Sequence, residues 1–300
     1  MLALTILGNN SAIPAFDRNP TSQLLQTAEE GYLIDCGEGT QLQMSKYKVR
    51  RSKVNHIFIS HLHGDHYFGL IGLLTSMSLL QRTNELHVYG PAMLEEIINL
   101  QLIAADTHLS FPLHFHPLKE EGLIVDGKKI EVYCFKTQHR IACWGFLFRE
   151  KKKPRKINAV NAFACEIPNA YFEKLQQGHD YTRKDGSIIS NESVTMAAPP
   201  PLSYAYCADT IYDESLAEKV KGVDLLYHET TYLKDLEERA AARFHSTTIQ
   251  AAAIAKRAGV KKLLIGHFSS KYETLDEFLT EAVEVFENTE LALEGACYQV

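Results

Sequence analysis

The segment FISHLHGDHYFG, residues 58–69, places four potential metal ligands within six positions, directly after a run of β-forming residues. These ligands are His61, His63, Asp65 and His66. Side chains two residues apart on an extended chain share a direction, and Gly64 lets the chain bend so that Asp65 and His66 approach a neighbouring point. Zinc binds imidazole and carboxylate groups, and a catalytic zinc keeps one position for water. The segment therefore predicts a catalytic metal site.

Three further ligands are predicted at the ends of other strands. His139 follows a strand ending at Phe135, Asp209 follows 204–208, and His267 follows 263–266. Loops at strand ends commonly carry functional side chains. We assign His61, His63 and His139 to one zinc and Asp65, His66 and His267 to a second, with Asp209 between them, because two ions ~3.5–4 Å apart need an anionic bridge.

The surrounding sequence predicts an α/β fold. Two strand-rich sets, each with helical segments, indicate two sheets packed face to face with helices outside, a four-layer αββα sandwich. The first set of expected strands comprises 2–7, 22–26, 32–34, 57–59, 86–89, 130–135 and 144–148, and the second set comprises 204–206, 225–227, 263–265 and 291–292. Expected helices cover 68–80, 93–104, 215–220, 248–257 and 275–286.

The pattern of strands and helices lapses between Glu150 and Pro201. This stretch begins with the basic run KKKPRK, contains the polar stretch QQGHDYTRKDGS and ends in three prolines. It is typical of an insertion that protrudes from the body, with a small packed subdomain as the alternative. We expect one domain over residues 1–300, with an inserted arm at 150–193.

Composition narrows the class of protein. The 300 residues are 45% hydrophobic and 23% charged, as in an ordinary globular chain. No apolar run reaches the ~20 residues of a membrane helix, and no leader sequence is visible, so we expect a cytoplasmic protein without a membrane partner. The six cysteines form no C-x-x-C pair and are expected to be reduced.

The net charge of −6 argues only weakly against a nucleic-acid partner, because local clusters of Lys and Arg decide phosphate binding. Two basic runs stand out, KYKVRRSK at 46–53 and KKKPRK at 151–156. Each run is either a solvated loop or a contact with a phosphate backbone, and the sequence leaves both readings open.

The signature H-x-H-x-D-H at 61–66 resembles that of the metallo-β-lactamase superfamily. Within it, the chain is similar to short-form ribonuclease Z over nearly its whole length. This resemblance rests on IPAFDRNP at 13–20, LIDCGEGTQ at 33–41, YAYCADT at 204–210, HETTY at 228–232, FHST at 244–247 and GHFSSKY at 266–272.

The resemblance implies a pairing of Glu229 with His245, which separates phosphodiester cleavage from other chemistries on this fold. Glu229 ends a strand, and His245 precedes a helix whose Thr247 and Gln250 have the spacing of a capping box. Glu229 is expected to accept a hydrogen bond from one ring nitrogen of His245, which leaves the other to donate to the departing 3′-oxygen.

The resemblance also implies the reaction. We expect in-line attack by a metal-bound hydroxide on precursor tRNA, with Asp65 as orienting group and general base, leaving a 3′-hydroxyl on the tRNA and a 5′-phosphate on the trailer. The expected cofactors are two Zn²⁺ per subunit, with Mn²⁺ as a substitute. The arm, including Lys151, Lys152 and Lys153, is expected to grip the tRNA on a partner subunit, which implies a homodimer and no other protein partner. Further substrate contacts are predicted at Arg18, Asn19, Ser269, Ser270 and Lys271.

Two alternatives stay open from the sequence. One is another hydrolase of the same fold, such as a glyoxalase-type thioesterase or an arylsulfatase-like phosphodiesterase, against which Glu229, His245 and the basic arm argue. The other is a non-catalytic RNA-binding protein with a structural metal site, although such sites are usually tetrahedral and rich in cysteine.

Overall fold

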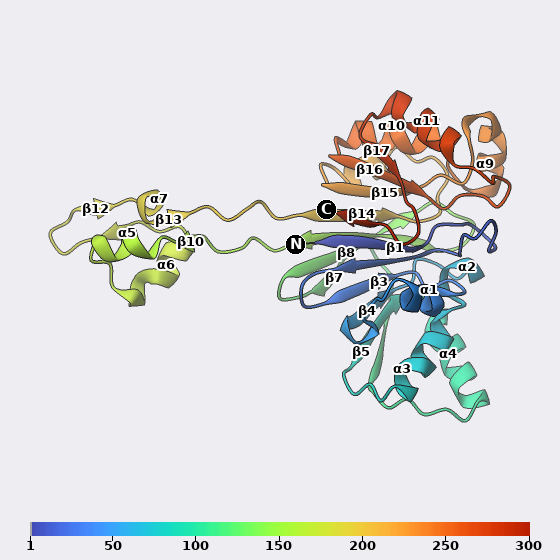
Figure 1. Cartoon of the computed structure of the whole chain (residues 1–300), viewed down its shortest axis with the longest axis horizontal. Coiled ribbons are helices and arrows are strands. Elements are labelled where there is room, and N and C mark those ends of the chain that lie inside the picture. Colours follow the sequence, from blue (N-terminus) through green and yellow to red (C-terminus); the bar gives the residue numbers. More distant parts are fainter. Residues whose placement is uncertain (1) are drawn as a thin grey trace.

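The computed structural model describes residues 2–300, and two seven-stranded sheets lie face to face at its centre (Figure 1). The first sheet has the order β18 (Cys297–Gln299), β1 (Ala3–Gly8), β2 (Ser22–Gln26), β3 (Gly31–Ile34), β4 (Val54–Phe58), β5 (Leu86–Gly90) and β6 (Leu113–Pro117). The second has the order β17 (Thr289–Leu291), β16 (Lys262–Gly266), β15 (Leu225–Glu229), β14 (Ser203–Cys207), β9 (Cys143–Glu150), β8 (Ile130–Thr137) and β7 (Gly122–Asp126).

Helices cover the outer face of each sheet, which confirms the four-layer prediction. The first sheet carries α1 (Thr40–Lys46), α2 (Gly64–Tyr67), α3 (Leu70–Leu79) and α4 (Met93–Ala104). The second carries α8 (Leu216–Lys219), α9 (Glu237–Arg243), α10 (Thr248–Ala258) and α11 (Asp276–Val285). None of the helices in residues 2–300 is long and apolar enough to cross a membrane.

Successive side chains along a strand point to opposite faces of the sheet, so each sheet has a separate core on each face. In β9, Phe146 and Phe148 join the core between the sheets, whereas Leu147 joins the core under the outer helices. A strand buried on both faces reads as a continuous apolar run, which is why CWGFLF is recognisable from sequence.

The strands do not divide between the sheets at the middle of the chain, as two consecutive sets had suggested. β7, β8 and β9 belong to the second sheet because they form antiparallel hairpins that extend from β14. β18, at the other end of the chain, returns to pair with β1. Short turns therefore keep β7 to β9 together, and long-range pairings decide where β9 and β18 lie.

Helix α10 begins where the sequence predicts and ends one residue later than expected, at Ala258. Thr247 and Gln250 form both hydrogen bonds of a capping box, and Gly259 ends the helix with a φ of 63°. Such an N-cap typically contributes about 0.5–2 kcal/mol to stability, and a left-handed C-terminal residue favours glycine. The capping box fixes the start of α10 immediately after His245.

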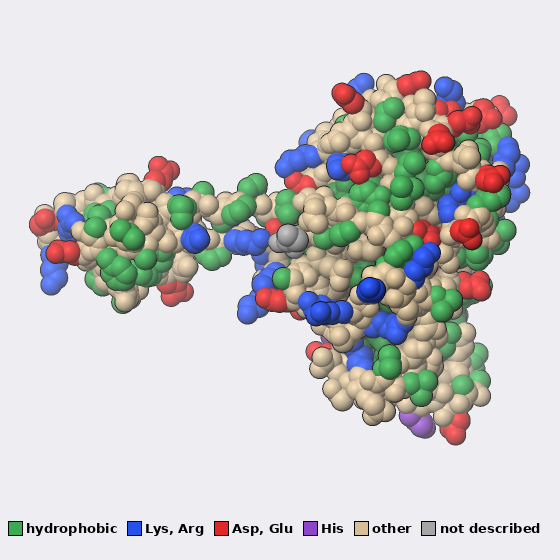
Figure 2. Space-filling model, in the orientation of Figure 1, with side chains coloured by type: hydrophobic (Ala, Val, Ile, Leu, Met, Phe, Trp, Pro, Cys, Tyr) green, Lys and Arg blue, Asp and Glu red, His purple; other side chains and the backbone are tan. Residues whose placement is uncertain are grey.

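The segment between β9 and β14 forms an arm that stands away from the body (Figure 1). It contains β10 (Lys156–Ile157), α5 (Ala159–Ala164), α6 (Phe172–Gln176), β11 (Tyr181–Thr182), β12 (Ile188–Ile189), α7 (Asn191–Val194) and β13 (Thr195–Met196). Ala162, Ile167, Leu175 and Val194 form its own small apolar core. Basic side chains gather where the arm joins the body (Figure 2). The arm is thus both a protrusion and a small packed unit.

Candidate metal centre and active site

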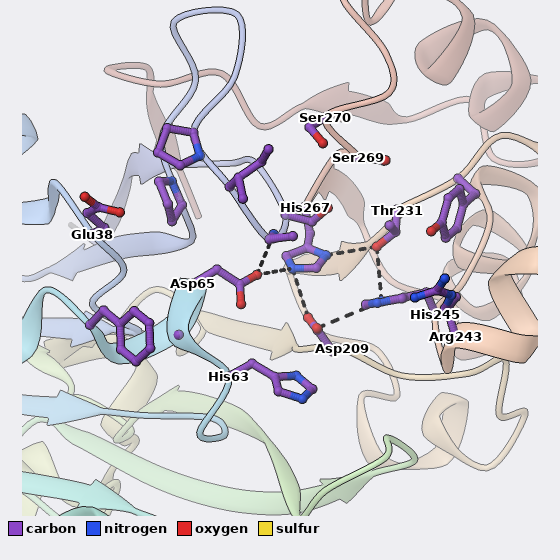
Figure 3. Close-up of a pocket in the computed structure, with 18 of the residues that line it drawn as sticks. Glu38, His63, Asp65, Asp209, Thr231, Arg243, His245, His267, Ser269 and Ser270 are labelled. Carbon is purple, nitrogen blue, oxygen red and sulfur yellow. Dashed lines mark hydrogen bonds and ion pairs between the residues drawn. The ribbon is translucent and has the colours of Figure 1, made fainter. Parts of the chain in front are cut away.

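A pocket of about 640 Å³ opens where the carboxyl ends of several strands meet (Figure 3). β14, β15 and β16 are parallel neighbours in the second sheet, and β4 of the first sheet leads into the ligand loop. The turn between β8 and β9 carries His139 to the same place. His63, Asp65, Asp209, His245 and His267 all line this pocket. Parallel strands bring their following loops to one edge, so distant parts of the chain converge here.

The first predicted ligand set converges closely. Nε2 of His61 lies 3.0 Å from Nδ1 of His63, and Nε2 of His139 lies 3.1 Å from the same atom. Asp209 Oδ2 lies 3.6 Å from Nε2 of His61. Two ligands of one tetrahedral zinc, each bonded at about 2.0–2.1 Å, are about 3.3 Å apart. These four residues therefore fit a single ion.

The second set lies beside the first. Nε2 of His66 is 3.3 Å from Nε2 of His267, and Asp65 Oδ2 is 3.5 Å from His66 and 3.6 Å from His267. The other oxygen of Asp209, Oδ1, lies 3.2 Å from His267. The two oxygens of Asp209 thus face different ligand sets. Asp209 Oδ1 is buried and accepts no hydrogen bond among the described residues, which fits a metal ligand.

Neighbouring acceptors settle which nitrogen of four histidines carries the proton. Nδ1 of His66 lies 2.7 Å from Asp35, Nδ1 of His139 lies 2.9 Å from the Phe244 carbonyl, and Nδ1 of His267 lies 2.9 Å from the Thr231 hydroxyl. Nδ1 of His61 lies 3.0 Å from the hydroxyl of Ser60, whose own proton goes to Asp35. In each ring Nδ1 has an acceptor, so Nε2 is the nitrogen that faces the centre. For His66, the carboxylates of Asp209, Asp65 and Asp35 outweigh burial and raise the pKa of the ring, and a metal ion would displace the proton on its Nε2.

Burial supports the same protonation state for the first ligand set. It lowers the pKa of His61 well below its usual value, and it also lowers the pKa of His63 and His139. Neutral imidazoles are the form that binds a metal ion. For Asp65, burial acts in the opposite direction, but His66 and His267 outweigh it and lower the pKa of the carboxyl group. The donor set therefore suits two divalent ions.

Asp35 is a fully buried carboxylate that sequence reasoning did not assign to the site. It accepts hydrogen bonds from Ser60 N at 2.7 Å, Ser60 Oγ at 2.8 Å and Tyr206 Oη at 2.6 Å, besides its contact with His66. The only signal in the sequence was the stretch LIDCGEGTQ. Asp35 holds the His66 ring and the chain that leads into the ligand loop.

Asp35→Asn is expected to weaken metal binding by about 10- to 100-fold, because the amide cannot accept from Tyr206, Ser60 and His66 together. Zinc affinity by competition with a chromophoric chelator measures this. Glu277→Ala, on an exposed helical position, is the control. Unchanged affinity in Asp35→Asn would contradict the orienting role.

The backbone bends sharply at two places in the site. Asp35 and His267 have φ values of 54° and 62°, in the left-handed region that side chains other than glycine rarely adopt. His267 follows Gly266, where an added Cβ would lie 2.4 Å from the Tyr227 hydroxyl. Such backbone strain persists when surrounding contacts hold it, and here it aims His267 into the pocket.

The predicted loop of four ligands contains a short helix. β4 ends at Phe58, His63 is the N-cap of α2, and Asp65 and His66 lie inside α2. Asp65 Oδ2 also accepts a hydrogen bond of 2.7 Å from Ala12 N. The turn of α2 separates the two histidines before Gly64 from the two ligands after it.

Glu229 and His245 form the predicted pair. His245 Nδ1 lies 3.0 Å from Glu229 Oε1, which also accepts hydrogen bonds from the backbone N–H groups of Ser246 and Thr210. Burial lowers the pKa of His245, but the Glu229 carboxylate outweighs burial and raises it to about 9. The Glu229 carboxylate therefore favours the protonated form of His245, in which Nε2–H can donate.

Thr231, which sequence reasoning missed, connects this pair to the metal ligands. Its hydroxyl donates to Glu229 Oε2 at 2.7 Å and lies 2.9 Å from Nδ1 of His267 (Figure 3). One hydroxyl thus fixes both the carboxylate behind His245 and the ring of a candidate ligand. His228 is buried and its Nδ1 bonds the Glu229 carbonyl, away from the pocket.

The predicted substrate contacts occupy different environments. Ser269 and Ser270 line the pocket. Arg18 is instead held inside the body by Asn10 and by the carbonyls of Tyr272 and Glu273, and Asn19 bonds Glu294. Arg18 and Asn19 therefore brace the loop that reaches Asp65. Lys271 is exposed and does not line the pocket, and its Nζ lies over the Tyr272 ring.

The basic run lies at the base of the arm, away from the metal ligands. Lys151 pairs with Asp126 and Lys153 pairs with Glu150, whereas Lys152 is exposed. Sequence reasoning did not single out two pocket-lining arginines, Arg140 and Arg243. Arg140 directly follows His139, and Arg243 lies two residues before His245, but an isolated arginine belongs to no recognisable motif.

Four histidines remote from the pocket form a stack on neighbouring strands. His56, His87 and Tyr89 lie on β4 and β5, and the rings of His114 and His116 on β6 lie 5.0 and 5.2 Å from that of His87. Burial lowers the pKa of His56 to about 4. This stack contributes nothing to the candidate metal centre.

Comparison with known proteins agrees with this geometry. The chain is 45% identical over 300 residues to the ribonuclease Z of Cytophaga hutchinsonii, covering 99% of this chain and 96% of that protein. The crystal structure of the short form of human tRNase Z matches with a TM-score of 0.72 at 24% identity, covering 99% of this chain and 98% of the other. The metallo-β-lactamase fold protein YhfI of Bacillus subtilis matches with a TM-score of 0.71 at 21% identity, covering 99% and 98%.

A family model described as "Anti-Pycsar protein Apyc1" matches residues 2–159. This range includes His61 to His139 but not Asp209, Glu229, His245 or His267. The full-length relatives cover those residues and the arm as well. The chain has the metallo-β-lactamase fold, contains in residues 2–159 the region of the Apyc1 family, and over its whole length belongs to the ribonuclease Z family.

Proposed function

We propose that this protein is a metal-dependent endoribonuclease that removes the 3′ trailer from precursor tRNA. Its membership of the ribonuclease Z family supports the reaction class. The observation that carries the proposal is the position of His245, whose Nδ1 lies 3.0 Å from the buried carboxylate of Glu229 and 3.9 Å from Asp209. A charged donor beside a dinuclear ligand set suits cleavage of a phosphodiester with a poor leaving group.

The residues present fit two zinc ions, with Mn²⁺ as a substitute. His61, His63 and His139 would hold one ion, and Asp65, His66 and His267 the other, with Asp209 shared. Bound there, such ions lower the pKa of water from 15.7 to about 7 and neutralise phosphate charge.

The side chains divide the proton transfers between them. Asp65, fixed by Ala12 N, orients the attacking water and accepts its proton. His245 lies across the pocket from Asp65 (Figure 3) and donates its Nε2 proton to the departing 3′-oxygen. Glu229 and Thr231 hold the His245 ring during this transfer. The products carry a 3′-hydroxyl on the tRNA and a 5′-phosphate on the trailer.

Cleavage of a labelled precursor tRNA by the purified protein with zinc tests this function. A nitrophenyl phosphodiester and a thioester run beside it, and the 3′ end of the product is mapped. We expect one cut next to the acceptor stem, lost on chelation. Turnover of the small diester alone would leave a dinuclear phosphodiesterase and contradict the tRNA assignment.

We propose that the arm binds the body of a tRNA whose 3′ end lies in the pocket of a second subunit. Strand β9 begins beside the metal ligands, after His139, and ends at the arm. Its eight residues span roughly 24 Å at ~3.4 Å per residue, so the arm and the pocket lie at opposite ends of the same strands. An arm so placed reaches the pocket of a partner more readily than its own, which supports a homodimer. We further propose that the protein acts in the cytoplasm.

An arm deletion separates RNA recognition from chemistry. Glu150 N donates to Leu202 O at 2.8 Å, so Asn-Gly in place of residues 151–201 closes a two-residue hairpin between β9 and β14. We expect kcat/KM for precursor tRNA to fall at least roughly a hundredfold, as several phosphate contacts are lost. Hydrolysis of the nitrophenyl diester and zinc content should stay near wild type. Undiminished tRNA cleavage would contradict the arm's role.

A further inference from the structure

Arg140 and Arg243 are the only Lys or Arg side chains in the lining of the pocket within residues 2–300. Both are exposed, and neither guanidinium has an ion pair or a side-chain hydrogen bond in the described structure. Arg18, in contrast, is already engaged by the backbone carbonyls of Tyr272 and Glu273. Two free guanidinium groups in one cavity of an acidic protein indicate an anionic ligand.

The two arginines project from adjacent stretches of backbone. Arg140 follows His139, whose Nδ1 bonds the Phe244 carbonyl at 2.9 Å. Arg243 is the last residue of α9, and Phe244 turns the chain with a φ of 58°. Arg243 lies two residues before His245 in the chain, and both residues line the pocket. The rings of His139 and His245 are 5.2 Å apart, so the backbone that carries each arginine passes beside the candidate proton donor.

The opposite side of the pocket has a different chemistry. Figure 3 shows Glu38 on the side of Asp65, away from His245. Phe68, three residues after Asp65 and 62% exposed, also lines the pocket, as do Pro14 and Ile13, which is 55% exposed. No lysine or arginine lines this side in the part of the chain that the structure describes. A backbone phosphate gains charge-assisted hydrogen bonds only on the arginine side.

The position of His245 gives the direction of the RNA strand, and this step rests on the proposed function. His245 protonates the 3′-oxygen of the last tRNA nucleotide, so that nucleotide lies on its side of the pocket. We propose that Arg140 and Arg243 bind the next backbone phosphate in the 5′ direction, between the last two nucleotides of the mature tRNA. The first trailer nucleotide then lies against Phe68.

A substrate with one phosphate neutralised tests this subsite. Precursor tRNA is assembled by ligation with a methylphosphonate at the linkage 5′ to the scissile one, or at the linkage 3′ to it as the matched control. Each RNA is cleaved by wild type, by Arg140→Ala/Arg243→Ala and by Arg257→Ala. Arg257 pairs with Glu214 on the surface away from the pocket, so Arg257→Ala controls for the loss of a positive charge.

We expect the 5′ methylphosphonate to lower wild-type kcat/KM about 10- to 100-fold, and the double variant to be insensitive to it, because charge and partner are coupled. The 3′ methylphosphonate should affect both proteins equally, and Arg257→Ala should behave as wild type. Arg140→Lys/Arg243→Lys should recover part of the sensitivity. If wild type cleaves unmodified RNA but both proteins respond equally to the 5′ substitution, the subsite is wrong. If wild type fails to cleave any RNA, the proposed function falls, and this assignment with it.

Discussion

Asp209→Ala is expected to remove metal binding and RNA cleavage together. The two oxygens of Asp209 face separate ligand sets, Oδ2 toward His61 and Oδ1 toward His66 and His267. Its loss leaves both sets without their shared anion, so the effect should exceed the roughly 10- to 100-fold expected when an outer partner such as Asp35 is changed. Zinc content after dialysis and the rate of precursor cleavage measure the two losses.

Two comparisons make this result specific. Glu277→Ala removes a carboxylate from an exposed part of α11 and should keep both ions and full activity. Asp209→Asn keeps the volume of the side chain and should lose nearly as much as alanine, since an amide bridges two cations poorly. Two retained zinc ions in Asp209→Ala would show that another group bridges the sets.

His245→Ala is expected to lower kcat for precursor tRNA about 10²- to 10⁴-fold while both ions stay bound, because the variant removes the proton donor and none of the ligands in the two main sets. Nitrophenolate leaves without protonation, so hydrolysis of a nitrophenyl diester should fall much less than RNA cleavage. An equal loss on both substrates would mean that His245 acts on binding or on the metal centre.

The dependence on pH gives a second test of the same role. The donor form of His245 is present below its pKa of about 9 and is lost as the pH rises through that value, so kcat/KM should decline on the alkaline side. Glu229→Gln removes the carboxylate that raises this pKa. We expect the decline to begin at lower pH in the variant. A decline at the same pH in both proteins would assign it to another group.

The parts predicted from sequence were those with local signals. The ligand spacing at 61–66, the buried run of β9 and the capping box of α10 each lie within about a dozen residues. Their physical causes are local too: alternation along a strand, burial on two faces, and the free N–H groups of a helix start. Strand β9 and the capping box were read correctly without knowledge of the rest of the chain, and the ligands predicted at 61–66 lie in convergent groups that suit a metal ion.

The parts that sequence reasoning missed depend on contacts between distant segments. Asp35 meets Tyr206 across the two sheets, and Thr231 meets His267 through the neighbouring strands β15 and β16. Arg18 and Asn19 were predicted as substrate contacts because they lie on a loop near the site. Their side chains instead form hydrogen bonds with Tyr272 and Glu294 within the body of the protein. No local pattern reveals such partners.

The bracing of the loop by residues near the other end of the chain bears on when the enzyme becomes competent during synthesis. Asn9 donates a hydrogen bond to the carbonyl of Ala292, and Glu294 accepts hydrogen bonds from Asn19 and Gln43. Strand β18 pairs with β1. The segment that carries Ala12 toward Asp65 therefore lacks these contacts until residues 292–299 have left the ribosome. A nascent chain that already holds every metal ligand would still lack this part of the bracing, so the pocket becomes fully rigid only after residues 292–299 follow His267.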